Sequence, residues 1–440
     1  MLAELAEWIA IPSVSADPAR AADVERAGDW LVGKIREAGG AAERIGWQGQ
    51  PLVVAEIAAS GGREAPTVLC YGHFDVQAVD PLELWESEPF TLVERDGWLY
   101  GRGSADDKGQ LFMLLEATRS LARENALPVN VRFLCDGEEE VGGGSIAEFL
   151  IADERGADAC LIFDTAMIER DVPAFTIASR GLAYFHLELT SGERDLHSGV
   201  YGGAALNALH ALNDLLAAVL PKNGRLPESL MAGVVPPSDE ELAAISVLPS
   251  GQRTLAEQGA RPADESAATE FYLRTCARPA LDVNGIEGGS PHLQKTVLPV
   301  RATANVSIRL APGQDADAIA AALEQLLTGA TPTGADLRVQ LLSASPPALV
   351  DQNAPAIELA LAAFERSFGR RPLLVRIGGT LPIMPALEAR GIPAIVTGFD
   401  LPEGNIHSPN ERLWAGYLEP GIAVAKAILT ELGARLETRR

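Results

Sequence analysis

The sequence is poor in basic residues and in cysteine, and it lacks long apolar runs. It holds 36 lysines and arginines against 60 aspartates and glutamates, which gives a formal net charge of −24. Nucleic-acid binding needs a basic surface, and no lysine or arginine cluster supplies one, which argues against a nucleic-acid partner. No stretch of 18 apolar residues occurs, which argues against a membrane-spanning helix and a membrane partner.

The few cysteines are widely spaced. Cys70, Cys135, Cys160 and Cys276 form no CxxC pair, so the sequence suggests neither a zinc knuckle nor a disulfide framework. The N-terminal segment carries acidic residues where a signal peptide has lysine or arginine. We therefore predict a cytoplasmic protein with reduced thiols.

The length and apolar content predict a folded α/β protein. The chain has 440 residues, of which 47% are hydrophobic, enough for about two or three domains. Short apolar runs alternate with longer amphipathic stretches, a pattern typical of a layered α/β domain. We expect helices at residues 17–38, 108–124 and 144–153. Strands covered on both faces are expected at residues 67–72, 129–135, 159–163 and 393–397.

The middle of the chain has a different pattern. From about Gly181 the strands alternate between apolar and polar residues, which predicts an α+β domain with one sheet face open or paired. Its helices are expected at residues 204–220 and 315–327. Because Pro346 and Pro347 indicate a return linker, we expect one domain at residues 1–180 and 351–440, interrupted by a second at 181–350.

Histidines and carboxylates follow the four buried strands. They are His73 and Asp75, Asp136 with the three glutamates 138–140, Asp164, and His407. In open α/β sheets ligands bind beyond the carboxyl ends of the strands, so these side chains are expected to converge.

Each of these motifs has a less specific interpretation when it is taken alone. Asp75 lies two residues after His73 and can hold its ring from the same side of an extended segment, but a buried histidine near a surface aspartate is the alternative. Asp106 and Asp107 precede a helix, where they can simply cap it. A helix cap is also the alternative for Asp164, and a structural role the alternative for His407.

The three adjacent glutamates are harder to explain without a cation. Glu138, Glu139 and Glu140 repel one another unless positive charge compensates them, and a solvated turn is the alternative. Together, two histidines and three carboxylates suit a pair of divalent ions with nitrogen and oxygen ligands. No HExxH, GxSxG, Walker or strand-linked GxGxxG motif competes with this interpretation.

The motifs YGHFDVQ, LYGRGSADDKG, DGEEEVGG and GNIHSPNE resemble those of a di-zinc metallopeptidase family. The family includes aminoacylase, carboxypeptidase G, succinyl-diaminopimelate desuccinylase and the carnosinase/cytosolic nonspecific dipeptidase group. The resemblance covers essentially the whole chain. It implies a three-layer α/β catalytic domain with a mainly parallel mixed sheet, interrupted by an α+β lid that mediates dimerisation.

The resemblance also assigns roles to the candidate residues. It implies that His73 and Asp164 bind one metal and that His407 binds the other, with Asp106 between the two and Glu140 as a further ligand. Asp75 would orient His73, and Glu139 would be the general base, because the family's E-E-x-G pattern selects the second and third glutamates.

Two further segments resemble the dipeptidase branch. DLHSGVYGG implies that His197 polarises the scissile carbonyl from the lid, often the lid of the partner subunit. NVSIRLAPG implies that Arg309 holds the substrate carboxylate, a role that suits guanidinium geometry. RIGGTLP resembles a loop lining the substrate site, with Arg376, Gly379 and Thr380.

The sequence thus predicts metal-dependent hydrolysis of dipeptides or similar small amides. The expected cofactors are two divalent metal ions, zinc first, with manganese or cobalt as alternatives. A homodimer is expected through the lid sheet or the helix at residues 204–220. Two other functions stay open: an N-acyl-amino-acid deacylase or desuccinylase on the same scaffold, and a non-catalytic metal- or peptide-binding protein.

Overall fold

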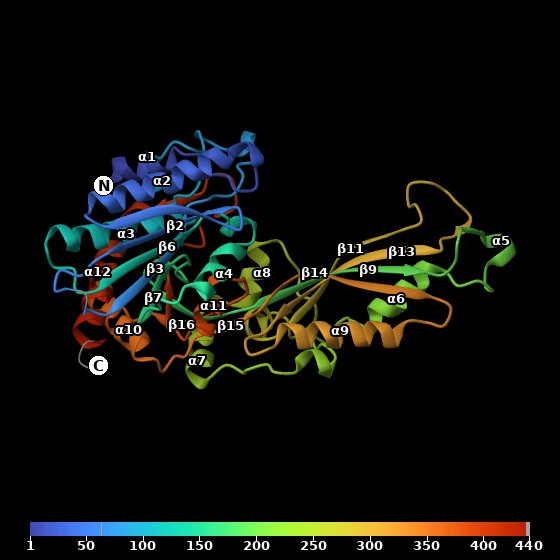
Figure 1. Cartoon of the computed structure of the whole chain (residues 1–440). Coiled ribbons are helices and arrows are strands. Elements are labelled where there is room, and N and C mark those ends of the chain that lie inside the picture. Colours follow the sequence, from blue (N-terminus) through green and yellow to red (C-terminus); the bar gives the residue numbers. More distant parts are fainter. Residues whose placement is uncertain (63, 437–440) are drawn as a thin grey trace. The chain divides into compact units, whose positions relative to one another are not determined.

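The computed structural model describes residues 1–62 and 64–436, which form two compact units (Figure 1). Unit 1 consists of the described residues of Met1–Ile177, Val350–Val375 and Pro382–Arg440, and unit 2 consists of Ala178–Leu349 and Arg376–Leu381. Strands β8 (Ala174–Ser179) and β16 (Leu373–Ile377) carry the chain from one unit to the other.

Segment Arg376–Leu381 belongs to unit 2, whereas the sequence assigned it to the first domain with the rest of 351–440. Hydrogen bonds explain the difference. The Thr380 hydroxyl donates to the Arg180 carbonyl at 2.7 Å, and the Arg180 N–H donates to the Gly379 carbonyl at 3.2 Å. These contacts tie the segment to the residue that precedes strand β9 (Gly181–Thr190) of unit 2.

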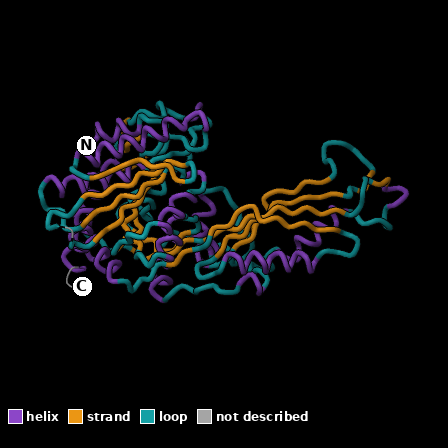
Figure 2. The backbone as a smooth tube through the Cα atoms, viewed as in Figure 1, coloured by secondary structure: helices purple, strands orange, loops and turns teal. Residues whose placement is uncertain are grey.

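Unit 1 is built on a six-stranded mixed sheet (Figure 2). In spatial order its strands are β1 (Ala41–Trp47), β2 (Gln50–Ile57), β6 (Asn130–Asp136), β3 (Thr67–His73), β7 (Ala159–Phe163) and β17 (Ala394–Thr397). The last four run parallel to one another, and β1 and β2 add antiparallel pairings at one edge. The predicted mainly parallel sheet is therefore confirmed.

Helices cover both faces of this sheet, which is why its parallel strands are almost wholly buried. One layer contains α1 (Leu2–Ile9), α2 (Ala21–Glu37), α3 (Lys108–Arg123), α10 (Pro355–Phe368) and α12 (Leu418–Leu436). The other contains α4 (Gly144–Ala152) and α11 (Ile383–Ala389). A small sheet of β4 (Val93–Arg95), β5 (Trp98–Tyr100) and β18 (Arg412–Trp414) completes the unit.

Unit 2 contains a four-stranded antiparallel sheet with one covered face. Its order is β11 (Ala280–Gly288), β13 (Arg301–Leu310), β9 and β14 (Asp336–Ser345). Helices α6 (Ala208–Val219) and α9 (Ala316–Ala330) pack on one face, so buried and partly exposed residues alternate along β9 and β13. This is the alternation that the sequence predicted.

Shorter elements complete unit 2. They are β10 (Leu196–His197), β12 (Val297–Leu298), β15 (Ala348–Leu349), α5 (Ser198–Tyr201), α7 (Asp239–Val247), α8 (Gly251–Glu257) and a π-helical turn at Leu273–Ala277. Among the helices of both units, within the described residues, none combines the length and apolar character needed to cross a membrane.

Candidate metal centre

Three parallel strands of unit 1 end at one group of polar side chains. Strand β3 ends at His73, β6 ends at Asp136 opposite it, and β7 ends one residue before Asp164. Because these strands are parallel neighbours, their carboxyl ends lie on one edge of the sheet. The fold thus gathers residues that are far apart in the chain.

Asp106 lies between two histidines. Its Oδ1 is 3.0 Å from Nε2 of His73, and its Oδ2 is 2.9 Å from Nε2 of His407. On the first side, His73 Nε2 is 3.8 Å from Oδ1 of Asp164. On the second side, His407 Nε2 is 3.0 Å from Oε2 of Glu140. The five predicted ligands therefore form two groups that share the carboxylate of Asp106.

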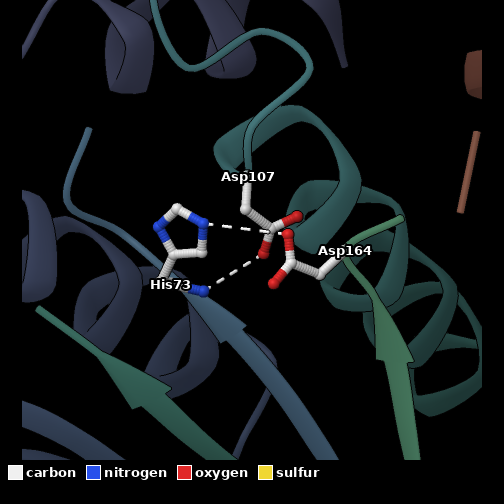
Figure 3. Close-up of side chains that lie close together, drawn as sticks. All are labelled: His73, Asp107 and Asp164. Carbon is white, nitrogen blue, oxygen red and sulfur yellow. Dashed lines mark hydrogen bonds and ion pairs between the residues drawn. The ribbon is translucent and has the colours of Figure 1, made fainter. Parts of the chain in front are cut away.

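Asp107 also belongs to this cluster (Figure 3). Its Oδ2 accepts a hydrogen bond from the backbone N–H of His73 at 3.1 Å. Potential ligand atoms of His73, Asp107 and Asp164 lie within 4.8 Å of one another. The sequence named Asp107 only as one of a possible capping pair. It occupies the N-cap position of α3, but its side chain makes no capping hydrogen bond.

Asp75 joins His73 to the glutamate segment. It is fully buried, and its Oδ1 lies 3.3 Å from Nδ1 of His73. Its two carboxylate oxygens also accept hydrogen bonds from the backbone N–H groups of Glu139 and Glu140, at 3.3 and 3.1 Å. Asp75 thus leaves Nε2 of His73 directed toward Asp106 and holds the glutamate turn in place.

The three glutamates have different surroundings. Glu138 Oε1 accepts the backbone N–H of Ser145 at 2.8 Å, so this side chain contacts the beginning of α4. Glu140 Oε2 contacts His407 and accepts a hydrogen bond from Gln77 at 2.8 Å. Burial raises the pKa of Glu139 to about 7. Glu138 therefore contacts the beginning of α4, whereas Glu140, one of the two glutamates that the E-E-x-G pattern selected, contacts His407.

The excess of carboxylates in the cluster favours the binding of positively charged groups or ions. Burial opposes ionisation of Asp106, but hydrogen bonds from His407 and His73 outweigh it and hold the pKa of Asp106 below its usual range. Hydrogen bonds to Asp106 and Glu140 raise the pKa of His407 to about 10. Burial also raises the pKa of Asp164 well above its ordinary value. Neighbouring buried carboxyl groups can all be ionised at once only when nearby cations compensate their negative charge.

The donor set fits a pair of divalent cations. Each group offers one imidazole nitrogen and carboxylate oxygens, the ligands that zinc and other borderline or hard dications accept. Two buried oxygens, Oε1 of Glu140 and Oδ1 of Asp107, have no hydrogen-bond partner among the described residues. Unpaired buried acceptors are costly, and a bound cation would satisfy them.

Glu411 holds the loop that carries Asp106, although no role was predicted for it from the sequence. Its fully buried carboxylate accepts the backbone N–H groups of Gly103, Ala105 and Asp106 at 2.9–3.1 Å. It also pairs with the buried guanidinium of Arg102 at 2.6 Å. Glu411 follows His407 by four residues, so one carboxylate fixes the loops of two predicted ligands relative to each other.

Replacing Glu411 by alanine is expected to destabilise the protein strongly. The change leaves the Arg102 guanidinium buried without its partner, which costs about 3–5 kcal/mol in comparable cases. Urea unfolding compared with the exposed-site control Glu403→Ala measures the effect. Equal unfolding midpoints for the two variants would contradict this account of the loop.

The predicted substrate residues lie in unit 2. His197 is an exposed residue at the end of β10, and its Nδ1 accepts the backbone N–H of Gly199 at 3.0 Å. Arg309 on β13 donates to the Thr380 hydroxyl at 3.3 Å. Gly379 precedes Thr380, and its carbonyl accepts the N–H of Arg180.

Arg376 has a different environment from Arg309. Its guanidinium is buried against Glu241 and also donates to the carbonyls of Val235 and Pro236. These contacts favour a structural role for the Arg376 side chain, although its segment carries Thr380.

A mainly parallel sheet with histidines and carboxylates at its carboxyl ends defines a class of protein, the metal-dependent α/β hydrolases. The family model for "Peptidase family M20/M25/M40" matches residues 69–431, so the chain belongs to this metallopeptidase family. It is therefore a hydrolytic peptidase of a family that uses divalent metal ions, and the family resemblance seen in the sequence is confirmed.

Similar proteins cover nearly the whole chain. The human Beta-Ala-His dipeptidase is 29% identical over 447 residues, covering 93% of this chain and 85% of the relative. The Cysteinylglycine-S-conjugate dipeptidase of Corynebacterium striatum is 28% identical over 446 residues, covering 97% and 94%. The solved structure of the M20 family metallo-carboxypeptidase Sso-CP2 from Sulfolobus solfataricus has 25% identity and a TM-score of 0.84, covering 98% and 99%.

Proposed function

We propose that this protein hydrolyses the peptide bond of dipeptides or similar small amides with the help of two divalent metal ions, zinc first. The observation that carries the proposal is the position of Asp106, whose two oxygens face two separate histidine–carboxylate groups. The similar dipeptidases named above support the substrate class.

The assignment of ligands follows the two groups. His73 and Asp164 would hold one ion, Glu140 and His407 would hold the other, and Asp106 would bridge them. When bound, such ions polarise a substrate carbonyl and lower the pKa of water. Zinc, manganese and cobalt all accept this donor set.

The residues of the chain would then act in turn. Asp75 keeps the His73 ring and the glutamate turn in place. Glu139, with its raised pKa, takes a proton from the attacking water and passes it to the leaving amine. His197 donates a hydrogen bond to the developing oxyanion, and Arg309 binds the substrate carboxylate.

A substrate panel tests this proposal. The purified protein, supplied with zinc, manganese or cobalt, is expected to release free amino acids from simple dipeptides faster than from N-acyl amino acids. Chromatography of the products measures both rates. Cleavage of N-acyl amino acids alone would instead support the deacylase or desuccinylase alternative, and no cleavage with bound metal would support the non-catalytic one.

We also propose a homodimer formed through unit 2. Among the described residues, no helix layer covers one face of its sheet. Large apolar side chains such as Ile286 and Leu342 are exposed on its edge strands β11 and β14. Exposed apolar residues on sheet edges are typical of association surfaces. Light scattering is expected to give twice the chain mass of 46.5 kDa, and a fully active monomer would contradict the proposal.

A cytoplasmic location is proposed as well. Cys70, Cys135 and Cys160 are buried and unpaired, and Cys276 is also free. Free thiols are typical of reducing compartments. Fractionation of the source cells tests this location.

A further inference from the structure

Unit 1 contains a cavity whose lining shares no residue with the metal centre. Its volume is about 540 Å³, which is within the range of small-molecule sites. Three segments line it: Arg170 with Asp171, the end of α10 with the following Arg370, and the segment from Trp414 to Pro420. None of these residues belongs to the predicted metal ligands or to the predicted substrate residues. The proposed reaction therefore does not use this cavity.

The guanidinium of Arg170 is stacked on an aromatic ring in this cavity. Its central carbon lies 3.8 Å from the ring centroid of Trp414. Stacking uses the flat face of a guanidinium, whereas its N–H donors point outward in the plane of the group. Within the described part of the chain, these donors bond no acceptor and Arg170 forms no ion pair. Trp414 therefore holds Arg170 in position while its donor edge stays available to an anion.

A second guanidinium, that of Arg370, lines the same cavity. Arg370 is exposed and directly follows Gly369, the residue that ends α10. Its Nη1 donates to the carbonyl of Asp171 at 3.2 Å, which is one contact for a group with five N–H donors. Among the residues that the structure describes, Arg370 has no carboxylate partner either. The cavity thus carries two guanidinium charges without ion pairs, in a protein whose formal net charge is −24.

Tyr417 fixes the turn that carries Arg170. Asp171 adopts a φ of 61°, in the left-handed region. Its N–H donates to the Tyr417 hydroxyl at 2.8 Å, and this hydroxyl donates to Oδ1 of Asp171 at 3.0 Å. The Asp171 carboxylate is therefore held by the buried Tyr417 and does not pair with either guanidinium. A turn fixed in this way lowers the entropic cost of binding a ligand.

We propose that this cavity binds a phosphate group, which is either part of a small organic phosphate or free phosphate. A carboxylate has two oxygens and one charge, whereas a phosphate monoester has three acceptor oxygens and a charge of about −1.5 to −2 at neutral pH. Phosphate can therefore accept hydrogen bonds from both guanidinium groups and from the Ser367 hydroxyl, which also lines the cavity. The aromatic rings of Phe368 and Trp414 suit the organic part of such a ligand.

Titration calorimetry on the metal-loaded protein tests the proposal with phenyl phosphate, inorganic phosphate, benzoate and phenol. We expect the phosphate probes to bind at least about 10-fold more tightly than benzoate or phenol, because only they can engage both guanidinium groups. Tighter binding of phenyl phosphate than of inorganic phosphate would identify an organic phosphate as the ligand, and equal binding would identify free phosphate. Arg170→Met should weaken phosphate binding by about 10- to 100-fold. Arg26→Met, at an exposed position on α2, is the control and should leave binding unchanged.

Phosphate also binds metal ions, so the location of binding needs its own test. Asp106→Asn, which should disturb the metal centre, is expected to retain the binding that depends on Arg170. Phosphate binding that is lost in Asp106→Asn but kept in Arg170→Met would place the ligand at the metal centre and overturn the proposal, as would no binding of either phosphate probe by the wild type. Should Arg170→Met fail to fold, as judged by circular dichroism, Arg370→Met at an exposed position decides the matter: a similar loss supports the proposal, and unchanged affinity overturns it.

Discussion

Replacing Glu139 by glutamine is expected to remove turnover while leaving metal binding intact. Glu139 has a raised pKa and is assigned no metal, and glutamine has the same shape but cannot take a proton. A positioned general base contributes about 10²- to 10⁴-fold to the rate, so kcat should fall by a factor in that range. Steady-state kinetics on a dipeptide and metal analysis of the same preparation measure both quantities.

The neighbouring glutamate provides a matched control for this variant. Glu138 contacts the N–H of Ser145 at the beginning of α4 and not the histidines. Glu138→Gln should therefore retain most of the activity. If Glu139→Gln were as active as the wild type, or if Glu138→Gln lost activity instead, the assignment of the base would be wrong.

Replacing Asp106 by asparagine is expected to have the second large effect, on metal binding itself. Its two oxygens serve both histidine groups, so an amide nitrogen at either position removes a shared ligand. Loss of a partner that only supports a ligand typically costs about 10- to 100-fold in metal affinity, and loss of a shared ligand should exceed about 100-fold. Activity should fall with it.

Titration calorimetry with zinc on the chelator-treated protein measures this change. Glu94→Gln, which removes an exposed carboxylate on β4 of the same unit, is the control for a simple loss of negative charge. Two tightly bound ions in Asp106→Asn would contradict the bridging role of Asp106.

The sequence could predict the sheet and most of the metal cluster because both depend on local pattern and topology. Apolar runs of strand length indicate buried parallel strands, and such strands end on one edge of a sheet. This places His73 and Asp164 together, because each lies at the end of such a strand. His407 follows β17 by ten residues, so its place in the cluster was predicted with the help of the family resemblance. The alternation along β9 and β13 likewise reveals a sheet with one covered face.

The remaining features depend on contacts between distant residues. Nothing local to Glu411 shows that its carboxylate binds three N–H groups some 300 positions earlier in the chain. The motif of Arg376 predicts a substrate-binding residue, but only the folded chain shows that Arg376 is paired with Glu241. Asp107 was visible in the sequence as half of an Asp-Asp pair, but whether it caps α3 depends on the turn geometry.

The measurement that tests the dinuclear site most directly is a titration of activity against bound metal. Chelator-treated protein is supplied with increasing zinc or manganese, and dipeptide hydrolysis and bound metal are followed together. We predict no turnover without metal and full turnover when two ions are bound per chain. Full turnover by protein that holds no metal, or a maximum reached with a single ion, would contradict the account.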